Sequence, residues 1–100
     1  MSLARRNPRR DENEAAIVAE LRAAGCLVER ISGAGVPDLM VWAPARGAIV
    51  LLEVKRPSQR KRLSDVQKHF RDAWRDAPVY LITSTAEALA AVTATATGST

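Results

Sequence analysis

Hydrophobic positions along the chain change their spacing several times, and the first regular spacing is helical. The apolar residues that recur three and four positions apart are Ile17, Val18 and Leu21. Asp11 is a good N-cap residue and Gly25 stops the run, so we expect a helix at about residues 11–24. Glu14 shares or borders the buried face of this helix, which is unusual for a glutamate. It serves there either as the capping-box partner of Asp11 or in a functional site.

Three short stretches rich in β-branched and apolar residues follow, separated by turns that contain glycine or proline. They are CLVERIS, VPDLMVW and AIVLLEVK, at residues 26–32, 36–42 and 48–55. Each stretch predicts a strand, and the short turns GAG and APARG predict an antiparallel meander. The third strand has the most continuous apolar composition, so we expect it to be the most buried.

A second helix is predicted from Ser64 to about Asp76, after a polar basic stretch. Ser64 and Gln67 stand at the spacing of a capping box. Apolar residues at helical spacing predict one row of side chains that faces the interior, which we call the inward row: Leu63, Val66, Phe70, Ala73 and Trp74. Gln67 belongs to the same side by its spacing, so it serves either as the helix cap or in a site facing the sheet.

PVYLIT then predicts a fourth strand, and STAEALAAV a short helix with its own capping box, Ser84 to Glu87. The order αβββαβα includes a strand, helix, strand passage, which implies a parallel crossover. The pattern therefore predicts an α/β fold with a mixed four-stranded sheet flanked by helices. We expect a basic arm at 1–10, a single domain at 11–94 and a flexible tail at 95–100.

Composition and charge narrow the function. The net charge of +4 is uneven: residues 1–10 carry four arginines and no acid, while residues 55–75 carry eight Lys or Arg against two Asp. Such a distribution favours a polyanion partner. The single histidine, His69, excludes catalysis by several histidines and is expected at the surface. The single cysteine, Cys26, excludes an intrachain disulfide, and no run of about 18 apolar residues is present. We therefore expect a soluble protein of the cytoplasm, or of the host cell cytoplasm if the source is viral.

Two charged residues, Glu53 and Lys55, stand at the end of the third predicted strand, where an unpaired charge is costly. Side chains alternate along a strand, so both point to the same side of the sheet. Antiparallel pairing would place Asp38, near the start of the second strand, beside Glu53. Two close carboxylates with a nearby backbone carbonyl suit a hard divalent metal such as Mg²⁺. A salt bridge between Glu53 and Lys55 that only caps the strand is the alternative.

These motifs together resemble a known nuclease family. GAGVPDLMVW, EVK fifteen positions after Asp38, and LSDVQ are similar to the VRR-NUC branch of the PD-(D/E)xK nuclease superfamily, from Glu14 to about Ile82. The resemblance implies a restriction-endonuclease-like fold and metal-dependent hydrolysis of phosphodiester bonds. It also implies that Asp38, Glu53 and the carbonyl of Val54 bind Mg²⁺ or Mn²⁺, with Glu14 reaching the metal or its waters.

The resemblance assigns further roles outside the metal ligands. Lys55 would orient or deprotonate the attacking water and stabilise the developing charge, and Gln67 would hold Lys55 or the water in line. The basic residues after the third strand are expected to contact DNA phosphates: Arg56, Arg60, Lys61 and Arg62. Trp42 and Trp74 are expected in the core or at an interface.

Stand-alone minimal members of this family resemble junction resolvases that work as symmetric dimers. We therefore expect a homodimeric endonuclease that prefers branched DNA such as Holliday junctions. Two other classes stay open at this point. One is a nucleic-acid-binding module of the same fold without turnover, and the other is a small interaction protein whose charged strand ends pair.

Overall fold

The computed structural model describes residues 8–56 and 63–93. In chain order, its elements are α1 (Pro8–Ala23), β1 (Leu27–Arg30), β2 (Leu39–Ala43), β3 (Ala48–Val54), α2 (Asp65–Ala73), β4 (Val79–Ile82) and α3 (Thr85–Thr93). The predicted order αβββαβα is therefore confirmed. In these two ranges no helix is both long enough and apolar enough to span a membrane.

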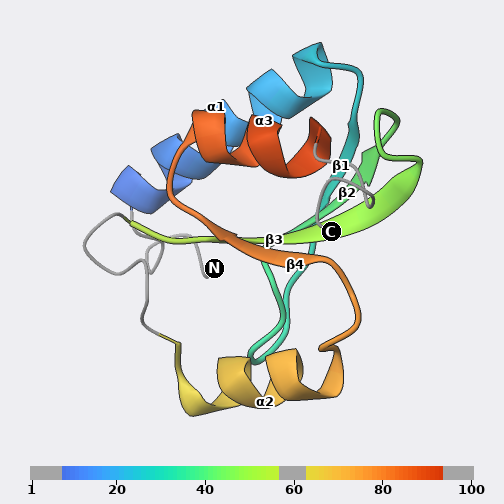
Figure 1. The fold of residues 1–100 in the computed structure, drawn as a ribbon. Coiled ribbons are helices and arrows are strands. Elements are labelled where there is room, and N and C mark those ends of the chain that lie inside the picture. The colour runs from blue at the N-terminus through green and yellow to red at the C-terminus, as the bar shows by residue number, and fades with distance from the viewer. Residues whose placement is uncertain (1–7, 57–62, 94–100) are drawn as a thin grey trace.

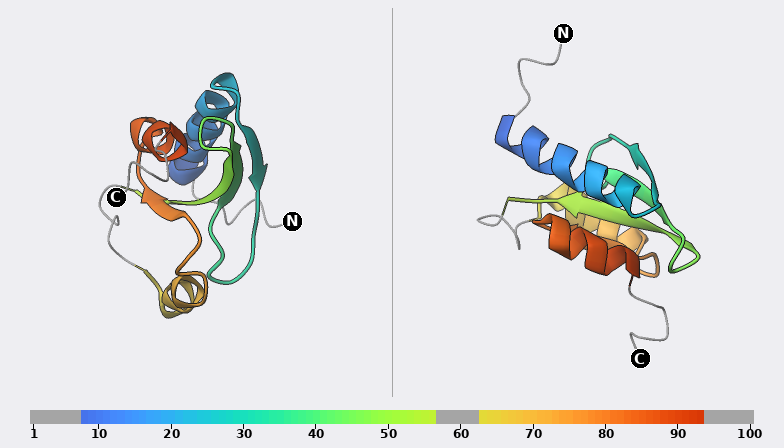
Figure 2. Two further views of the ribbon diagram at one scale, coloured as in Figure 1. Left: turned by 45° about the vertical axis from the view of Figure 1, so that its right-hand side comes forward. Right: turned by 90° about the horizontal axis from the view of Figure 1, so that it is seen from above.

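The four strands form one mixed sheet in the order β1-β2-β3-β4. The β1–β2 and β2–β3 pairs are antiparallel, and β3 and β4 are parallel. Helices α1 and α3 lie side by side over one face of the sheet, and α2 lies on the opposite side (Figures 1 and 2). The short turns between the first three strands explain their antiparallel pairing, and the passage through α2 explains the parallel pair.

The hydrophobic core lies between the sheet and the helices α1 and α3. Its largest fully buried side chains are Ile17, Leu21, Leu39, Val41, Val50, Leu52 and Val54. Alternate strand residues supply them, because successive side chains point to opposite faces of a sheet. Helix α3 contributes its small side chains Ala88 and Ala91, so its alanine-rich face packs inward.

The start of α1 differs from the prediction. The helix begins at Pro8, not at Asp11, so Asp11 lies inside the helix and the predicted N-cap is wrong. A proline is favoured in the first helical turn, because its missing N–H would have no partner there. The capping-box interpretation of Glu14 fails with the N-cap. Residues 8–10, assigned to the basic arm, are helical.

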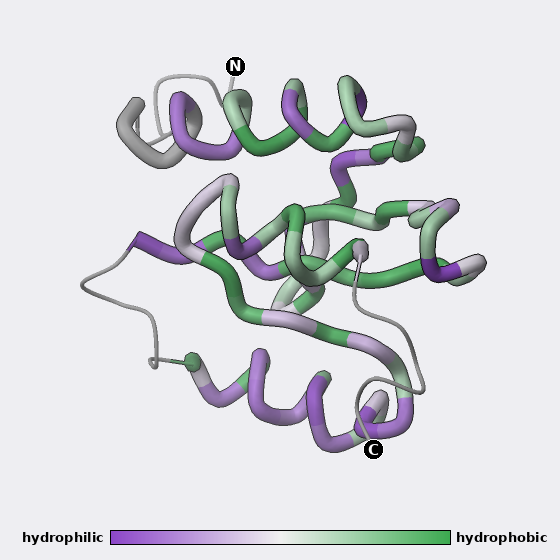
Figure 3. The backbone as a smooth tube through the Cα atoms, turned by 45° about the horizontal axis from the view of Figure 1, so that its top comes forward, coloured by the Kyte–Doolittle hydropathy of each residue, from purple (hydrophilic) through white to green (hydrophobic). Residues whose placement is uncertain are grey.

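Helix α2 begins as predicted but packs differently. Ser64 is its N-cap, and both hydrogen bonds of the predicted capping box with Gln67 are present. No residue of α2 is buried, and the predicted inward row is only partly right. Its members Leu63 and Phe70 are partly buried, as is Gln67, but Val66, Ala73 and Trp74 are exposed. Hydrophilic residues predominate along α2 (Figure 3), which agrees with a helix held at the surface.

Candidate active site

Asp38 lies one residue before β2, where the glycine-containing loop meets the sheet. Its backbone N–H donates to the carbonyl of Leu52 at 3.0 Å, which joins it to β3. Its carboxylate oxygen Oδ2 accepts a hydrogen bond from the backbone N–H of Val54 at 2.8 Å. The pairing of Leu39 with Leu52 continues to this point, so Asp38 lies beside Glu53. The structure thus brings the two carboxylate residues together as the strand register predicted.

Glu53 holds a buried carboxylate on the side of the sheet that faces α2. The residue is only 5% exposed, so its charge needs polar partners. Gln67 Nε2 donates a hydrogen bond to Glu53 Oε2 at 2.8 Å, and Lys55 Nζ lies 3.7 Å from the same oxygen. The ion pair expected from the salt-bridge interpretation is therefore present, but it belongs to a larger polar cluster.

Gln67 joins the two ends of this cluster. Its Oε1 accepts hydrogen bonds from Lys55 Nζ at 3.0 Å and from the backbone N–H of Ser64 at 2.9 Å. The sequence left open whether Gln67 serves as a helix cap or in a site, and in the structure it makes both sets of contacts. One amide group therefore connects the start of α2 to the charged end of β3.

These side chains border a polar pocket of about 220 Å³ at the end of β3. Its lining residues are Gly33, Gly35, Val36, Asp38, Glu53, Val54, Lys55, Arg56 and Gln67. A water molecule takes up about 30 Å³ of liquid, so the pocket has room for an ion with several waters or for a phosphate group. It brings two carboxylates, an ammonium group and an amide to one open cavity.

Glu14 does not line this pocket. It is 8% exposed, and its Oε2 forms an ion pair with Arg30 Nε at 3.0 Å. Over the described parts of the chain, no three Asp, Glu, His or Cys residues come close enough to hold a metal ion together. The role of Glu14 at a metal stays a prediction. The sequence did not indicate Arg30 as its partner, because the two residues meet only through the packing of α1 on β1.

The predicted DNA-contacting residues are only partly located. Arg56 lines the pocket, while Arg60, Lys61 and Arg62 lie outside the described residues. Helix α2 adds three exposed basic residues from the same basic stretch: Lys68, Arg71 and Arg75, the last just beyond the helix end. His69 is exposed on the same helix, as expected.

The contact between Gln67 and Lys55 was expected only from the family resemblance, and the structure contains it. One feature of the site escaped the sequence interpretation. The glycines of the loop carried a signal that was not used, because glycine often marks a close approach of two backbones. Gly35 has a positive φ of 77° and lies against the first turn of α2.

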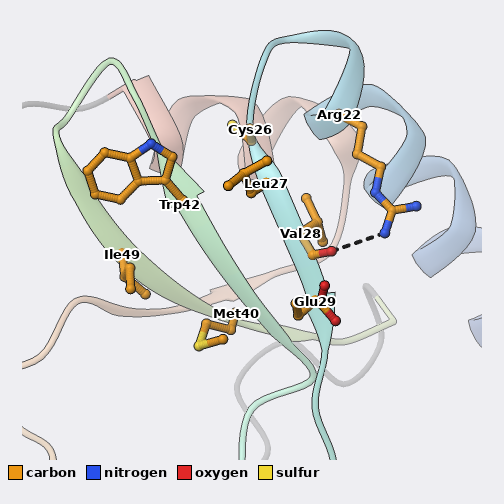
Figure 4. Close-up of a pocket in the computed structure, with 8 residues that line it drawn as sticks. All are labelled: Arg22, Cys26, Leu27, Val28, Glu29, Met40, Trp42 and Ile49. Carbon is orange, nitrogen blue, oxygen red and sulfur yellow. Dashed lines mark hydrogen bonds between the residues drawn. The ribbon is translucent and has the colours of Figure 1, made fainter.

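A second cavity, of about 520 Å³, lies on the outer surface of β1, β2 and β3. Figure 4 shows four large apolar side chains gathered there, which we call the apolar patch: Leu27, Met40, Trp42 and Ile49. Trp42 is 40% exposed and Trp74 is 52% exposed, so neither lies in the core, and their place at an interface stays a prediction. Burial raises the pKa of the nearby Cys26 thiol, which makes it a poor nucleophile. This cavity lacks the clustered carboxylate, ammonium and amide groups of the polar pocket.

The chain matches a known protein family. The model of the VRR-NUC domain matches residues 7–86, which include all four strands and the whole polar pocket. No curated protein and no solved structure matches the chain significantly. The family match covers most of the chain. The chain therefore belongs to the VRR-NUC family of nucleases.

Proposed function

We propose that this protein is a divalent-metal-dependent endonuclease that hydrolyses DNA phosphodiester bonds at the polar pocket. The observation that carries the proposal is the meeting of Asp38, Glu53, Lys55 and Gln67 around one open cavity. These residues come from a loop, a strand end and a helix that are far apart in sequence. A structural salt bridge would not require a pocket, a second carboxylate and a shared amide.

The donor chemistry of the pocket fits Mg²⁺ or Mn²⁺. Asp38 and Glu53 supply carboxylate oxygens, and Val54 adds a backbone carbonyl at the same strand end, which are the ligand types that hard divalent cations prefer. When bound, the ion would supply positive charge to the phosphate and lower the pKa of a coordinated water. The amide contact from Gln67 holds the Glu53 carboxylate in one orientation before any ion arrives.

Lys55 is the residue we propose to act on the water and on the phosphate. Its backbone N–H donates to the carbonyl of Ile82 at 2.8 Å, which ties it to β4. Its ammonium group contacts Gln67 and Glu53, so the side chain is held at the pocket wall. An ammonium group beside a carboxylate donates hydrogen bonds. Lys55 therefore orients the attacking water and stabilises the charge that develops on the phosphate.

The substrate we propose is branched DNA, in particular a four-way junction, cut by a homodimer. Arg56 at the pocket and the basic residues of α2 provide positive charge for phosphates without reading bases. Resolving a junction requires cuts in two strands, and the polar pocket is one site in one small domain. Two copies related by a two-fold axis would supply two pockets. The exposed apolar patch supports a second copy, since exposed clusters of large apolar groups mark contact surfaces.

The test is to incubate the purified protein with linear, flap and four-way junction DNA in Mg²⁺, in Mn²⁺ or with a chelator. We expect cleavage only with metal, paired nicks in the junction and slower cutting of linear duplex. Binding of junction DNA without cleavage under any condition would favour an inactive nucleic-acid-binding module. Neither binding nor cleavage would favour an interaction protein in which the charged strand ends only pair.

A further inference from the structure

The first turn of α2 controls which way the Gln67 amide faces. Ser64 has an extended backbone, with φ −69° and ψ 166°, and its Oγ accepts a hydrogen bond from the backbone N–H of Gln67 at 3.2 Å. The backbone N–H of Ser64 donates to Gln67 Oε1 at 2.9 Å in return. Because this N–H can only donate, it selects the amide orientation in which Oε1 faces the helix start.

That orientation is the one the polar pocket requires. With Oε1 directed to Ser64, the same oxygen accepts from Lys55 Nζ, and Nε2 is left to donate to Glu53. A flipped amide would set Nε2 against the Ser64 N–H and the Lys55 ammonium, and Oε1 against the Glu53 carboxylate. All three contacts would then be repulsive. The capping box and the pocket therefore favour one and the same state of Gln67.

Within the described residues, α2 has little apolar packing to hold it in place. No residue of α2 is buried, so apolar packing contributes less to its position than it does for α3, which buries Ala88, Ala91 and Val92. On the pocket side, a Cβ added to Gly35 would lie 2.5 Å from the carbonyl oxygen of Val66 and 3.1 Å from the backbone N of Gln67. The loop thus limits how closely the helix start approaches the pocket, and the Ser64 cap keeps that start folded.

We propose that Ser64 is a positioning residue of the nuclease site, which acts through Gln67 on Lys55 and Glu53. The proposal rests on the proposed function. Ser64 itself does not line the polar pocket, so its effect on the reaction passes through the Gln67 side chain. Loss of its hydroxyl would remove the bond to the Gln67 backbone N–H and loosen the first turn of α2, so the Ser64 N–H would no longer be held against Oε1 of the amide.

The test compares Ser64→Ala with Ser84→Ala. Ser84 Oγ accepts from the backbone N–H of Glu87 at 3.2 Å at the start of α3, on the opposite face of the sheet, so the control loses the same kind of bond away from the pocket. We expect Ser64→Ala to lower kcat on junction DNA roughly tenfold with KM unchanged, since small misplacements of catalytic groups are costly. Ser64→Thr should restore kcat, and Ser84→Ala should keep it. In a Gln67→Ala background, Ser64→Ala should have no further effect.

A second measurement does not depend on cleavage. The side-chain amide protons of Gln67, followed by NMR in ¹⁵N-labelled protein, should exchange with solvent faster in Ser64→Ala than in the wild type or Ser64→Thr. Failure of the wild type to cut any DNA would defeat the proposed function, and the amide measurement would still test Ser64. The positioning role is overturned by unchanged exchange in Ser64→Ala, by an unchanged kcat, or by an equal loss of kcat in Ser84→Ala.

Discussion

At the scale of single residues, the Gln67 side chain connects the polar pocket to the start of α2. Its amide has both a donor and an acceptor, which lets it contact a carboxylate and an ammonium group at once. Neither a carboxylate nor a lysine at this position could make both contacts. The spacing in LSDVQ made Gln67 a candidate, but only the position of α2 shows that the cap and the site share one group.

The change Gln67→Glu separates these two contacts. A glutamate still caps the helix and still accepts from Lys55, but it places a second carboxylate against the buried Glu53. We expect a folded protein whose cleavage rate falls by roughly a hundredfold, because the polar cluster must rearrange. Cleavage kinetics beside a far-ultraviolet circular dichroism spectrum would check this. Wild-type cleavage by Gln67→Glu would mean that the amide nitrogen is not needed.

Cys26 gives a prediction independent of nuclease activity. Burial raises the pKa of its thiol, so the native protein should react slowly with a thiol reagent at pH 8 and quickly once unfolded. The unfolded thiol ionises first as the pH rises, so the contribution of Cys26 to stability should decrease above its ordinary pKa. Equal reaction rates in native and denatured protein would contradict the buried position.

At the scale of elements, strand patterns were easier to predict than helix packing. Strand alternation and the four-stranded order followed from β-branched runs and short turns, and the register of β2 and β3 then placed Asp38 beside Glu53. The row on α2 was right for Phe70 and wrong for Val66 and Trp74, because helical spacing does not reveal how much of the helix contacts the sheet. The start of α1 was misjudged because Asp11 and Pro8 are both acceptable near a helix N-terminus.

The contact between the loop and α2 predicts the effect of Gly35→Ala. An added Cβ would overlap the backbone of Val66, so the helix start must move away from the pocket. Gly47→Ala is the matched control, since Gly47 also has a positive φ, of 65°, but a Cβ there meets nothing within 4 Å. Both changes should lower the free energy of unfolding by about 1–2 kcal/mol, because alanine is strained at a positive φ. In Gly35→Ala, the overlap of the Cβ with the Val66 backbone should lower it further. When the cleavage rate is divided by the fraction of folded protein, Gly35→Ala should lose most of the wild-type rate and Gly47→Ala should keep it. Equal cleavage by the two variants would show that the loop does not position the helix.

At the scale of the whole molecule, the two sides of the sheet differ in what covers them. Helices α1 and α3 cover one face and form the core, while the other side carries the polar pocket and the apolar patch. Ile49 and Glu53 lie four residues apart on β3, so both point to that second side. A partner bound at the patch would therefore lie on the same side of the sheet as the pocket.

The homodimer we propose should depend on this apolar patch. Trp42→Glu would place a charge in the middle of the patch and should convert a dimer into a monomer of 10.8 kDa in light scattering. Trp74→Glu is the comparison, because Trp74 is also exposed but is the C-cap residue of α2, stacked on Phe70. A wild-type protein that is monomeric at assay concentration would contradict the dimer. A dimer disrupted only by Trp74→Glu would place the interface on α2.

The central claim is that Asp38 and Glu53 hold a divalent metal for DNA cleavage. Its most direct test is the cleavage of junction DNA in Mg²⁺ by Asp38→Asn and Glu53→Gln. The side-chain amide in each variant keeps an oxygen that can accept the hydrogen bond from Val54 or Gln67, so folding and DNA binding should be retained. Each variant loses the negative charge of one carboxylate that would bind the metal. We predict that both variants bind junction DNA as the wild type does and cut it at least a hundredfold more slowly, roughly the loss expected when one charge-stabilising group is removed. Cleavage by either variant at the wild-type rate would contradict the account.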